Sequence, residues 1–383
     1  MSNDSAALIR SLIDTADDFV DARWRNLRKR FGWEGTPSIQ PYVGYANDDF
    51  VWMHGRVLTN PPSKTPEKDD SWWDNLLETY RRFESDEVPG VEVEIEFDGK
   101  KHLVTTDEEG YFHLQTDNVS QDVRGHNPWS SIAMRIVNNE LVSANDSLTT
   151  SKVLTPPATA RIGLISDIDD TILQTGAIEL LTVAKLTFLH NAKTRKPLAG
   201  VAALYRAFQD GVFTDHPQNN PVFYVSSSPW NLHDLLEDFL EYSNIPFGPV
   251  LLRDLGFDEN KFIAEGHSHK LTKARTVMSA YPKMPFVLFG DSGQEDAHLY
   301  AEAAKSHPEQ VKVIFIRDVD PEKTSTHDQK VIESIEIAKS VGVPMHLIKD
   351  SNAAATILKS MGFISDEWLP KIDAAVTRDL SAS

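Results

Sequence analysis

The sequence predicts an α/β protein in two parts: a small antiparallel β-sandwich preceded by an N-terminal helix, and a doubly wound, Rossmann-like parallel sheet. Three observations predict this fold class. Apolar residues recur at helical spacing near the N-terminus, apolar and acidic residues alternate strictly over 91–97, and short apolar runs separate helical patterns beyond Pro156. The length of 383 residues accommodates two or three domains of roughly 100–200 residues each.

Residues 1–37 are predicted to contain an amphipathic helix. Apolar side chains recur at spacings of three and four between Ile9 and Leu27, and basic residues end the pattern at 28–30. Basic residues in a last turn complement the helix dipole, which favours a helix packed on the protein. The alternative is a helix that lies on an anionic membrane surface. Acidic residues on the polar face of the helix disfavour this alternative.

Residues 38–155 are predicted to form the antiparallel β-sandwich. Residues 91–97 alternate between apolar side chains and glutamate, Asp98-Gly99 supplies a hairpin turn, and 101–105 is the partner strand. Further short strands with turn signals between them follow, as in a sandwich. The stretch 106–112, Thr-Asp-Glu-Glu-Gly-Tyr-Phe, resembles the prealbumin-like modules appended to many enzymes and surface proteins.

Residues 156–383 are predicted to form the parallel α/β domain, which begins at the Pro156-Pro157 boundary. Short apolar runs separated by helical patterns are typical of strands buried on both faces of a parallel sheet. These runs occupy residues 162–165, 222–225, 286–289, 311–316 and 345–348.

The charge and the composition exclude several classes of protein. There are 38 Lys and Arg against 57 Asp and Glu, a net charge of −19, which excludes a basic nucleic-acid-binding protein. The chain has no cysteine, which excludes disulfides, thiolate metal sites and cysteine nucleophiles. We find no apolar run long enough for a transmembrane helix and no secretory signal in Met1-Ser2-Asn3-Asp4, so we expect a cytoplasmic protein.

Polar residues follow three of the predicted parallel strands. In such a sheet, ligands bind just beyond the carboxyl ends of the strands. Asp167 and Asp169 follow the first run, Ser226 follows the second, and Asp291 and Asp296 follow the third. Carboxylates gathered in one crevice repel one another unless a cation neutralises them. We therefore predict a metal site formed by Asp167, Asp169, Asp291 and Asp296, and its oxygen ligands match Mg²⁺.

Zinc matches this set less well, because cysteine is absent and the strand ends carry no histidine pair at helical spacing. His267 and His269 precede Lys270 and are alternative metal ligands. In a Gly-His-Ser-His loop, however, we expect both histidines to be solvated.

The order of these motifs resembles the haloacid-dehalogenase superfamily of phosphohydrolases. The matching residues are Asp-x-Asp-x-Thr at 167–171, Ser226, Lys270, and Gly290-Asp291 with Asp296 five residues further on. The longer strings at 165–173, 224–232 and 289–296 look more narrowly like the catalytic domain of the actin-patch type of phosphatidate phosphatase. The resemblance covers about residues 160–350 and implies a haloacid-dehalogenase-like fold for the second domain.

The resemblance also implies a role for each motif residue. Asp167 would attack phosphorus and form an aspartyl-phosphate, while Asp169 would protonate the leaving alkoxide and then activate water. Mg²⁺ would be bound by the Asp167 carboxylate, the Asp169 backbone carbonyl and Asp291, with Asp296 supporting the metal shell or orienting Lys270. The predicted phosphate-binding residues are Ser226, Ser227, Lys270 and Thr171.

Three neighbouring residues have alternative interpretations. Lys273 is a second candidate for the phosphate lysine. Ser228 before Pro229 is the pattern of a helix N-cap followed by proline at the first helical position, so we expect a structural role for Ser228. Trp230 would lie at the mouth of the site and meet an acyl chain, or belong to the core.

The predicted function is a Mg²⁺-dependent phosphomonoesterase that acts on phosphatidate or a related lipid phosphate, at the surface of membranes. The segments between the motifs are too short for a full globular cap domain, and an open site suits a bulky substrate presented by a membrane. One alternative is a soluble sugar phosphate or nucleotide phosphate as substrate. Another is a partner-binding protein in which the β-sandwich has the main role. The oligomeric state does not follow from the sequence.

Overall fold

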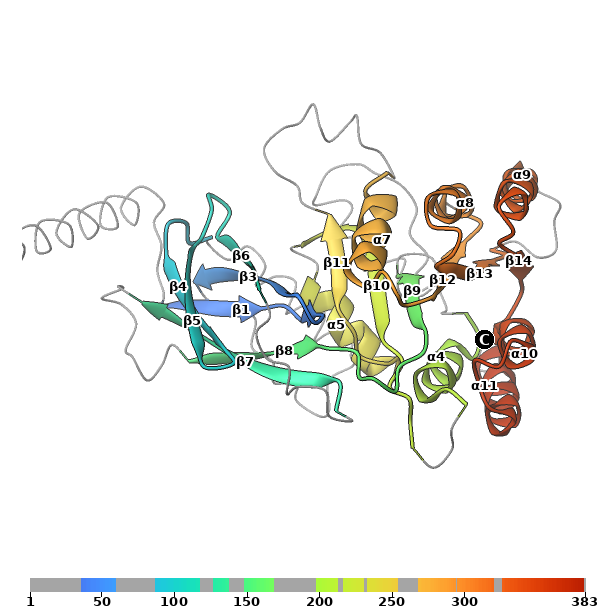
Figure 1. The fold of residues 1–383 in the computed structure, drawn as a ribbon, viewed down its shortest axis with the longest axis horizontal. Helices are drawn as coiled ribbons and strands as arrows, with labels where there is room; N and C mark the ends of the chain where they lie inside the picture. Colours follow the sequence, from blue (N-terminus) through green and yellow to red (C-terminus); the bar gives the residue numbers. More distant parts are fainter. Residues whose placement is uncertain are drawn as a thin grey trace, which may run out of the picture.

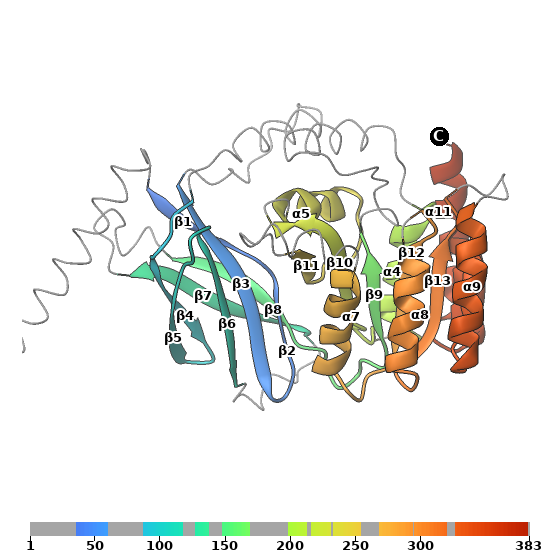
Figure 2. The same cartoon turned by 90° about the horizontal axis from the view of Figure 1, so that it is seen from above.

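The computed structural model describes residues 36–59, 87–117, 127–137, 148–168, 198–212, 216–230, 233–253, 268–293, 295–319 and 326–381. These residues form a mostly antiparallel sheet and a parallel sheet flanked by helices, which lie side by side in Figures 1 and 2. The predicted combination of an antiparallel and a parallel sheet is therefore confirmed. The predicted N-terminal helix falls outside the described residues, and the domain boundaries at 37 and 155 stay predictions.

The N-terminal sheet, here called the antiparallel unit, has the hydrogen-bonded order β1-β3-β2-β8-β7-β4-β5, with β6 paired to β3. All its pairs are antiparallel except β2 with β8. Its strands are β1 (Pro37–Pro41), β2 (Gly44–Ala46), β3 (Phe50–Thr59), β4 (Glu92–Phe97), β5 (Lys100–Thr105), β6 (Tyr111–Asp117), β7 (Trp129–Val137) and β8 (Thr149–Leu154).

The predicted hairpin is present as β4 and β5. Val93, Ile95 and Phe97 point into the core while the intervening glutamates point outward, which is the alternation read from the sequence. Asp98 and Gly99 have φ of 50° and 70°, the left-handed values that a two-residue turn between twisted strands requires. The structure differs from a sandwich of two separate sheets, because β2 pairs with both β3 and β8 and joins all eight strands.

The C-terminal sheet contains six parallel strands in the order β11-β10-β9-β12-β13-β14. The five predicted apolar runs lie in β9, β10, β12, β13 and β14. The central strands are buried on both faces, which is why their sequences are continuously apolar. The strands are β9 (Gly163–Asp167), β10 (Val222–Pro229), β11 (Val250–Arg253), β12 (Phe286–Asp291), β13 (Val311–Arg317) and β14 (Met345–Ile348).

Helices cover both faces of this sheet (Figure 1). One face carries α7 (Ser268–Ala280), α8 (Asp296–Ser306) and α9 (Thr326–Ser340), and the other carries α4 (Val201–Asp210), α5 (His233–Tyr242), α10 (Ser351–Ser360) and α11 (Leu369–Ser381), with a short 3₁₀ turn η2 (Asp366–Trp368) before α11. Each face has its own apolar core: Leu164 and Phe289 pack towards α4, and Ile165 and Leu288 pack towards α7 and α8. Among the described residues, no helix is long and apolar enough to cross a membrane.

The two units share a buried interface. Tyr45 of β2 packs edge-on against Phe223 of β10, with ring centroids 6.0 Å apart. The Tyr281 hydroxyl donates to the carbonyl oxygen of Ala46 at 2.9 Å, and the Asn47 amide donates to that of Ala280 at 2.6 Å. Apolar burial and satisfied hydrogen bonds thus hold the antiparallel unit against the parallel sheet.

Candidate functional site

Three aspartates from separate strand ends lie together in the structure. Asp167 is the last residue of β9, Asp291 is the last residue of the adjacent strand β12, and Asp296 opens α8. One carboxylate oxygen from each lies within 4.8 Å of the others, and all three side chains are buried. The carboxyl ends of neighbouring parallel strands meet at one edge of the sheet, which explains the convergence.

The turn between β12 and α8 fixes Asp291 and Asp296 against each other. The Gly293 amide donates to Asp291 Oδ1 at 2.6 Å, and the Asp291 amide donates to Asp296 Oδ2 at 3.3 Å. A Cβ on Gly290 would lie 2.7 Å from the Cβ of Asp296 and 2.8 Å from its Oδ2. Only glycine lets Asp296 approach the strand this closely, which explains the Gly290-Asp291 pair at the end of β12.

We expect Gly290→Ala to destabilise the protein by about 1–3 kcal/mol, because the added methyl group must displace the buried Asp296 side chain. Denaturant unfolding followed by circular dichroism measures the change. An unfolding midpoint equal to that of the wild type would contradict the close packing of Asp296 on the strand.

Lys270 connects two of these aspartates. It lies in the first turn of α7, its side chain is fully buried, and its Nζ is 2.8 Å from Asp167 Oδ1 and 3.0 Å from Asp296 Oδ1. Lys273 lies one turn further along the same helix and is half-buried. Of the two predicted lysines, Lys270 is therefore the one that the structure places between the carboxylates.

The site has an excess of negative charge. Burial, and secondly the charge of Asp167, raise the pKa of Asp296 to about 7, although the Lys270 ammonium opposes the shift. Three buried carboxylates face one ammonium group, so a fully ionised site needs about two further positive charges. An all-oxygen donor set with this charge fits a hard divalent cation. Asp167, Asp291 and Asp296 are the described residues that could hold it.

Ser226 lies within β10, the other neighbour of β9, three residues before the strand ends. In the register of these strands Val225 pairs with Asp167, so Ser226 is one residue beyond the nucleophile candidate. Its side chain is buried, its Oγ accepts from the Ser228 amide at 2.8 Å, and Ser227 beside it is half-buried. The predicted residues Asp169 and Thr171 lie outside the described residues, so their placement stays a prediction.

Two expectations in this region were wrong. Ser228 is not an N-cap followed by a helix at Pro229, because β10 continues through Pro229 and α5 begins at His233. His269 is not solvated: it is buried, and its Nε2 lies 3.3 Å from the carbonyl oxygen of Ser226, a contact that requires a proton on Nε2. The alternative ligand His267 lies outside the described residues.

Sequence reasoning missed a group on α5, where ligand atoms of His233, Asp234 and Glu237 lie within 4.8 Å of one another. The spacing of four residues between His233 and Glu237 is the sequence feature that could have revealed this group. Trp230, proposed for the mouth of the site or for the core, is only 4% exposed and belongs to the core.

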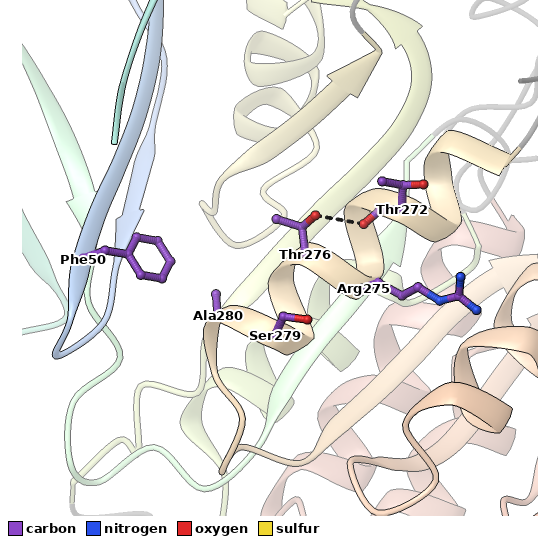
Figure 3. Close-up of a pocket in the computed structure, with 6 residues that line it drawn as sticks. All are labelled: Phe50, Thr272, Arg275, Thr276, Ser279 and Ala280. Atoms are coloured by element: carbon purple, nitrogen blue, oxygen red, sulfur yellow. Dashed lines mark hydrogen bonds between the residues drawn. The ribbon is translucent and has the colours of Figure 1, made fainter. Parts of the chain in front are cut away.

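A separate pocket of about 490 Å³ lies between α7 and Phe50 of β3 (Figure 3). The helix lines it with small and polar side chains, among which the Thr276 hydroxyl donates to the carbonyl oxygen of Thr272 at 3.0 Å. None of the three aspartates lines this pocket. The pocket therefore belongs to the interface between the units, while the carboxylates lie at the strand ends.

Comparisons with known proteins find a family model over the region that contains this site. Residues 162–318 match the family model described as the catalytic domain of phosphatidate phosphatase APP1. The chain is 30% identical over 195 residues to phosphatidate phosphatase APP1 of Saccharomyces cerevisiae, a match covering 50% of this chain and 32% of that protein. It is 33% identical over 160 residues to an uncharacterized protein of Schizosaccharomyces pombe, covering 41% of this chain and 25% of that protein.

Each match therefore spans a third or less of the length of the yeast relative. Among solved structures, a carbohydrate acetylesterase from Xanthomonas citri aligns over 89% of this chain and 74% of its own, with 9% identity and a TM-score of 0.31. That likeness is too low to carry an argument about fold or activity.

Proposed function

We propose that this protein is a Mg²⁺-dependent phosphomonoesterase that hydrolyses phosphatidate or a related lipid phosphate, because residues 162–318 match the family model of the phosphatidate phosphatase APP1 catalytic domain. The observation that carries the proposal is the buried group of Asp167, Asp291 and Asp296 bridged by Lys270. The order of the motifs along the sequence supports a doubly wound, haloacid-dehalogenase-like fold. The strand order of the parallel sheet, which places β9 beside β12, also supports it.

Asp167 is the proposed nucleophile. Lys270 Nζ lies 2.8 Å from its Oδ1, and a carboxylate oxygen is the atom that attacks phosphorus. In the first step a carboxylate oxygen of Asp167 bonds to phosphorus and the bond from phosphorus to the leaving oxygen breaks. Asp169, two residues further along the chain, donates its proton to that leaving oxygen.

The second step releases phosphate. Asp169, now ionised, accepts a proton from a water molecule whose oxygen bonds to phosphorus, and the bond between phosphorus and Asp167 breaks. Inorganic phosphate leaves, and both aspartates return to their initial protonation states. Ser226, Ser227, Thr171 and Lys270 are the proposed donors to the phosphoryl oxygens.

The proposed Mg²⁺ ligands are the carboxylates of Asp167 and Asp291 and the backbone carbonyl of Asp169. Asp296 accepts from both Lys270 and the Asp291 amide, so it orients a metal ligand and the lysine at once. A bound Mg²⁺ would neutralise negative charge on the phosphoryl oxygens and help to orient them.

We expect the wild-type protein to release phosphate from phosphatidate in detergent micelles with Mg²⁺, and to lose this activity in excess chelator. Asp291→Asn should lower the rate at saturating Mg²⁺ by at least about 100-fold, because it removes a charged ligand. Asp98→Asn is the matched control, since asparagine tolerates the left-handed turn conformation at this exposed position. Full activity in chelator, or in Asp291→Asn, would contradict the proposal.

The same assay separates the two substrate classes. Faster turnover of phosphatidate than of soluble sugar or nucleotide monoesters, at matched phosphoester concentration, would support the lipid substrate. The opposite order would assign the same chemistry to a soluble phosphate.

A further inference from the structure

Six aromatic side chains, four buried and two half-buried, form a cluster across the interface between the two units. Four come from the antiparallel unit and two from the segment that follows β10, where α5 begins on the side of the parallel sheet that faces the antiparallel unit (Figure 1). We call this group the interdomain cluster; its members are Tyr42, Trp52, His54, Tyr111, Trp230 and His233.

Trp230 is the centre of the contacts between the units. Its ring centroid lies 5.0 Å from that of Tyr42, with the planes 17° apart, and 4.4 Å from that of His54. Tyr42 also lies 4.0 Å from the ring of His233, the first residue of α5. Contacts at these separations contribute beyond simple burial of apolar area, so the antiparallel unit holds Trp230 firmly.

Two rings at the centre of the cluster, those of His54 and Tyr42, are neutral over the pH range in which a phosphatase would be assayed. Burial, more than the neighbouring positive charges, lowers the pKa of His54 to about 3. Burial also raises the pKa of Tyr42 well above its ordinary value, with nearby tyrosine and carboxylate charges adding to the shift. These two rings therefore contribute packing contacts to Trp230.

Trp230 lies three residues after Ser227, the second of the predicted phosphate-binding serines of β10. The pairing of β10 with β11 is regular up to Val225 and then shifts before Pro229. The pairing of β10 is therefore irregular between these two points, and within this segment the Ser228 amide donates to Ser226 Oγ at 2.8 Å. Asp167, as the register partner of Val225, fixes one end of this segment, and Trp230 is fixed at the other.

We propose that the antiparallel unit completes the active site, with Tyr42 and His54 acting through Trp230 as positioning residues that hold the irregular segment 226–229 of β10 in its phosphate-binding conformation. The inference rests on the proposed function, because it takes this segment as the phosphoryl-binding element. It assigns the antiparallel unit a role in catalysis, and Tyr42, Trp230 and His54 need not touch substrate.

The test compares variants of Tyr42 in the full-length chain. Tyr42→Leu keeps apolar volume but removes the stacked ring, Tyr42→Phe keeps the ring, and Trp230→Leu removes the ring on the other side. Phe247→Ala is the matched control, because Phe247 also packs across the interface, on Trp129 at 5.2 Å, but does not belong to the interdomain cluster. Circular dichroism checks folding.

We expect Tyr42→Leu and Trp230→Leu to lower kcat/KM by about 10- to 100-fold, as small displacements of binding groups do. Binding of vanadate, used as a phosphate-like oxyanion, should weaken in the same variants, and hydrogen exchange in the peptide spanning 222–230 should accelerate. Tyr42→Phe and Phe247→Ala should stay within about twofold of the wild type.

Folded Tyr42→Leu with wild-type kcat/KM, vanadate affinity and exchange would overturn the inference while leaving the proposed function intact. If Tyr42→Leu does not fold, Trp230→Leu decides: a folded Trp230→Leu with wild-type kcat/KM, vanadate affinity and exchange would overturn the inference. A wild-type protein that releases no phosphate from any monoester would refute the proposed function instead. Vanadate binding and exchange still test the role of segment 226–229 in that case.

Discussion

Asp167→Asn is expected to abolish phosphate release, with a fall in kcat of at least about 10⁴-fold, the scale seen when a nucleophile is removed. Asparagine has almost the same shape, so the packing of the end of β9 is retained. The amide is a poor nucleophile towards phosphorus and cannot form the aspartyl-phosphate. Phosphate release from phosphatidate with Mg²⁺ measures the effect.

Stability distinguishes this loss from unfolding. Removing one of three buried negative charges relieves repulsion with Asp296, so metal-free Asp167→Asn should unfold at a denaturant concentration close to or above that of the wild type. The exposed variant Asp98→Asn serves again as the control for activity. Substantial turnover in Asp167→Asn would contradict the assignment of Asp167 as the nucleophile.

Lys270→Met is expected to give the largest loss of stability of any variant proposed here. The methionine fills similar volume, but Asp167 and Asp296 are left as buried carboxylates without the ammonium group that contacts both. Breaking a buried ion pair in this way costs about 3–5 kcal/mol. Denaturant unfolding of the chelator-treated protein measures the cost, and activity should be lost together with the phosphate-binding lysine.

The pH dependence of that loss has a definite sign. The pKa of Asp296 is already raised to about 7, and removing Lys270 raises it further, because the ammonium is what lowers it. Above this pKa the buried carboxylate is ionised in both the folded and the unfolded protein, and the full penalty applies. As the pH falls from 8 to 5, the folded protein takes up the proton first, so the destabilisation of Lys270→Met should shrink.

Two further variants test whether the loss of stability in Lys270→Met comes from the ion pairs with the aspartates. Lys270→Met combined with Asp296→Asn should recover part of the lost stability, since one uncompensated charge is removed with the lysine. Lys273→Met, one turn further on the same helix, should cost about 1 kcal/mol or less. Equal losses in Lys270→Met and Lys273→Met would mean that the ion pairs with the aspartates do not stabilise the fold.

Much of the parallel sheet and of the site follows from local sequence. A strand buried on both faces must be continuously apolar, so the runs at 162–165 and 286–289 identify β9 and β12 directly. Once neighbouring strands are parallel, residues after their carboxyl ends must meet, which brings Asp167 and Asp291 together. The position of Lys270 came from the order of motifs rather than from periodicity.

The features that were missed depend on contacts between distant parts of the chain. The link through β2 is only three residues long, too short for a periodic signal, yet it joins the halves of the antiparallel unit. Tyr42 and Trp230 meet only because the two units dock, which no local pattern reports.

The error at Ser228 has a local physical cause. Serine followed by proline favours the start of a helix, but Pro229 still pairs in the ladder with Arg253 of β11. The strand therefore continues past the serines, and the hydroxyl of Ser226 accepts the amide hydrogen of Ser228. Tertiary pairing outweighed the capping preference of the dipeptide.

Chemical trapping during turnover would report on covalent catalysis at the end of β9 without relying on any substitution. Protein quenched in the steady state with phosphatidate and Mg²⁺ is treated with borohydride, which reduces an acyl phosphate to an alcohol and leaves free carboxylates unchanged. Mass spectrometry of the peptide that spans β9 should then find the reduced side chain at residue 167 in turning-over samples alone. Rapid phosphate release with an unmodified residue 167, or with the modification at another residue, would contradict the account.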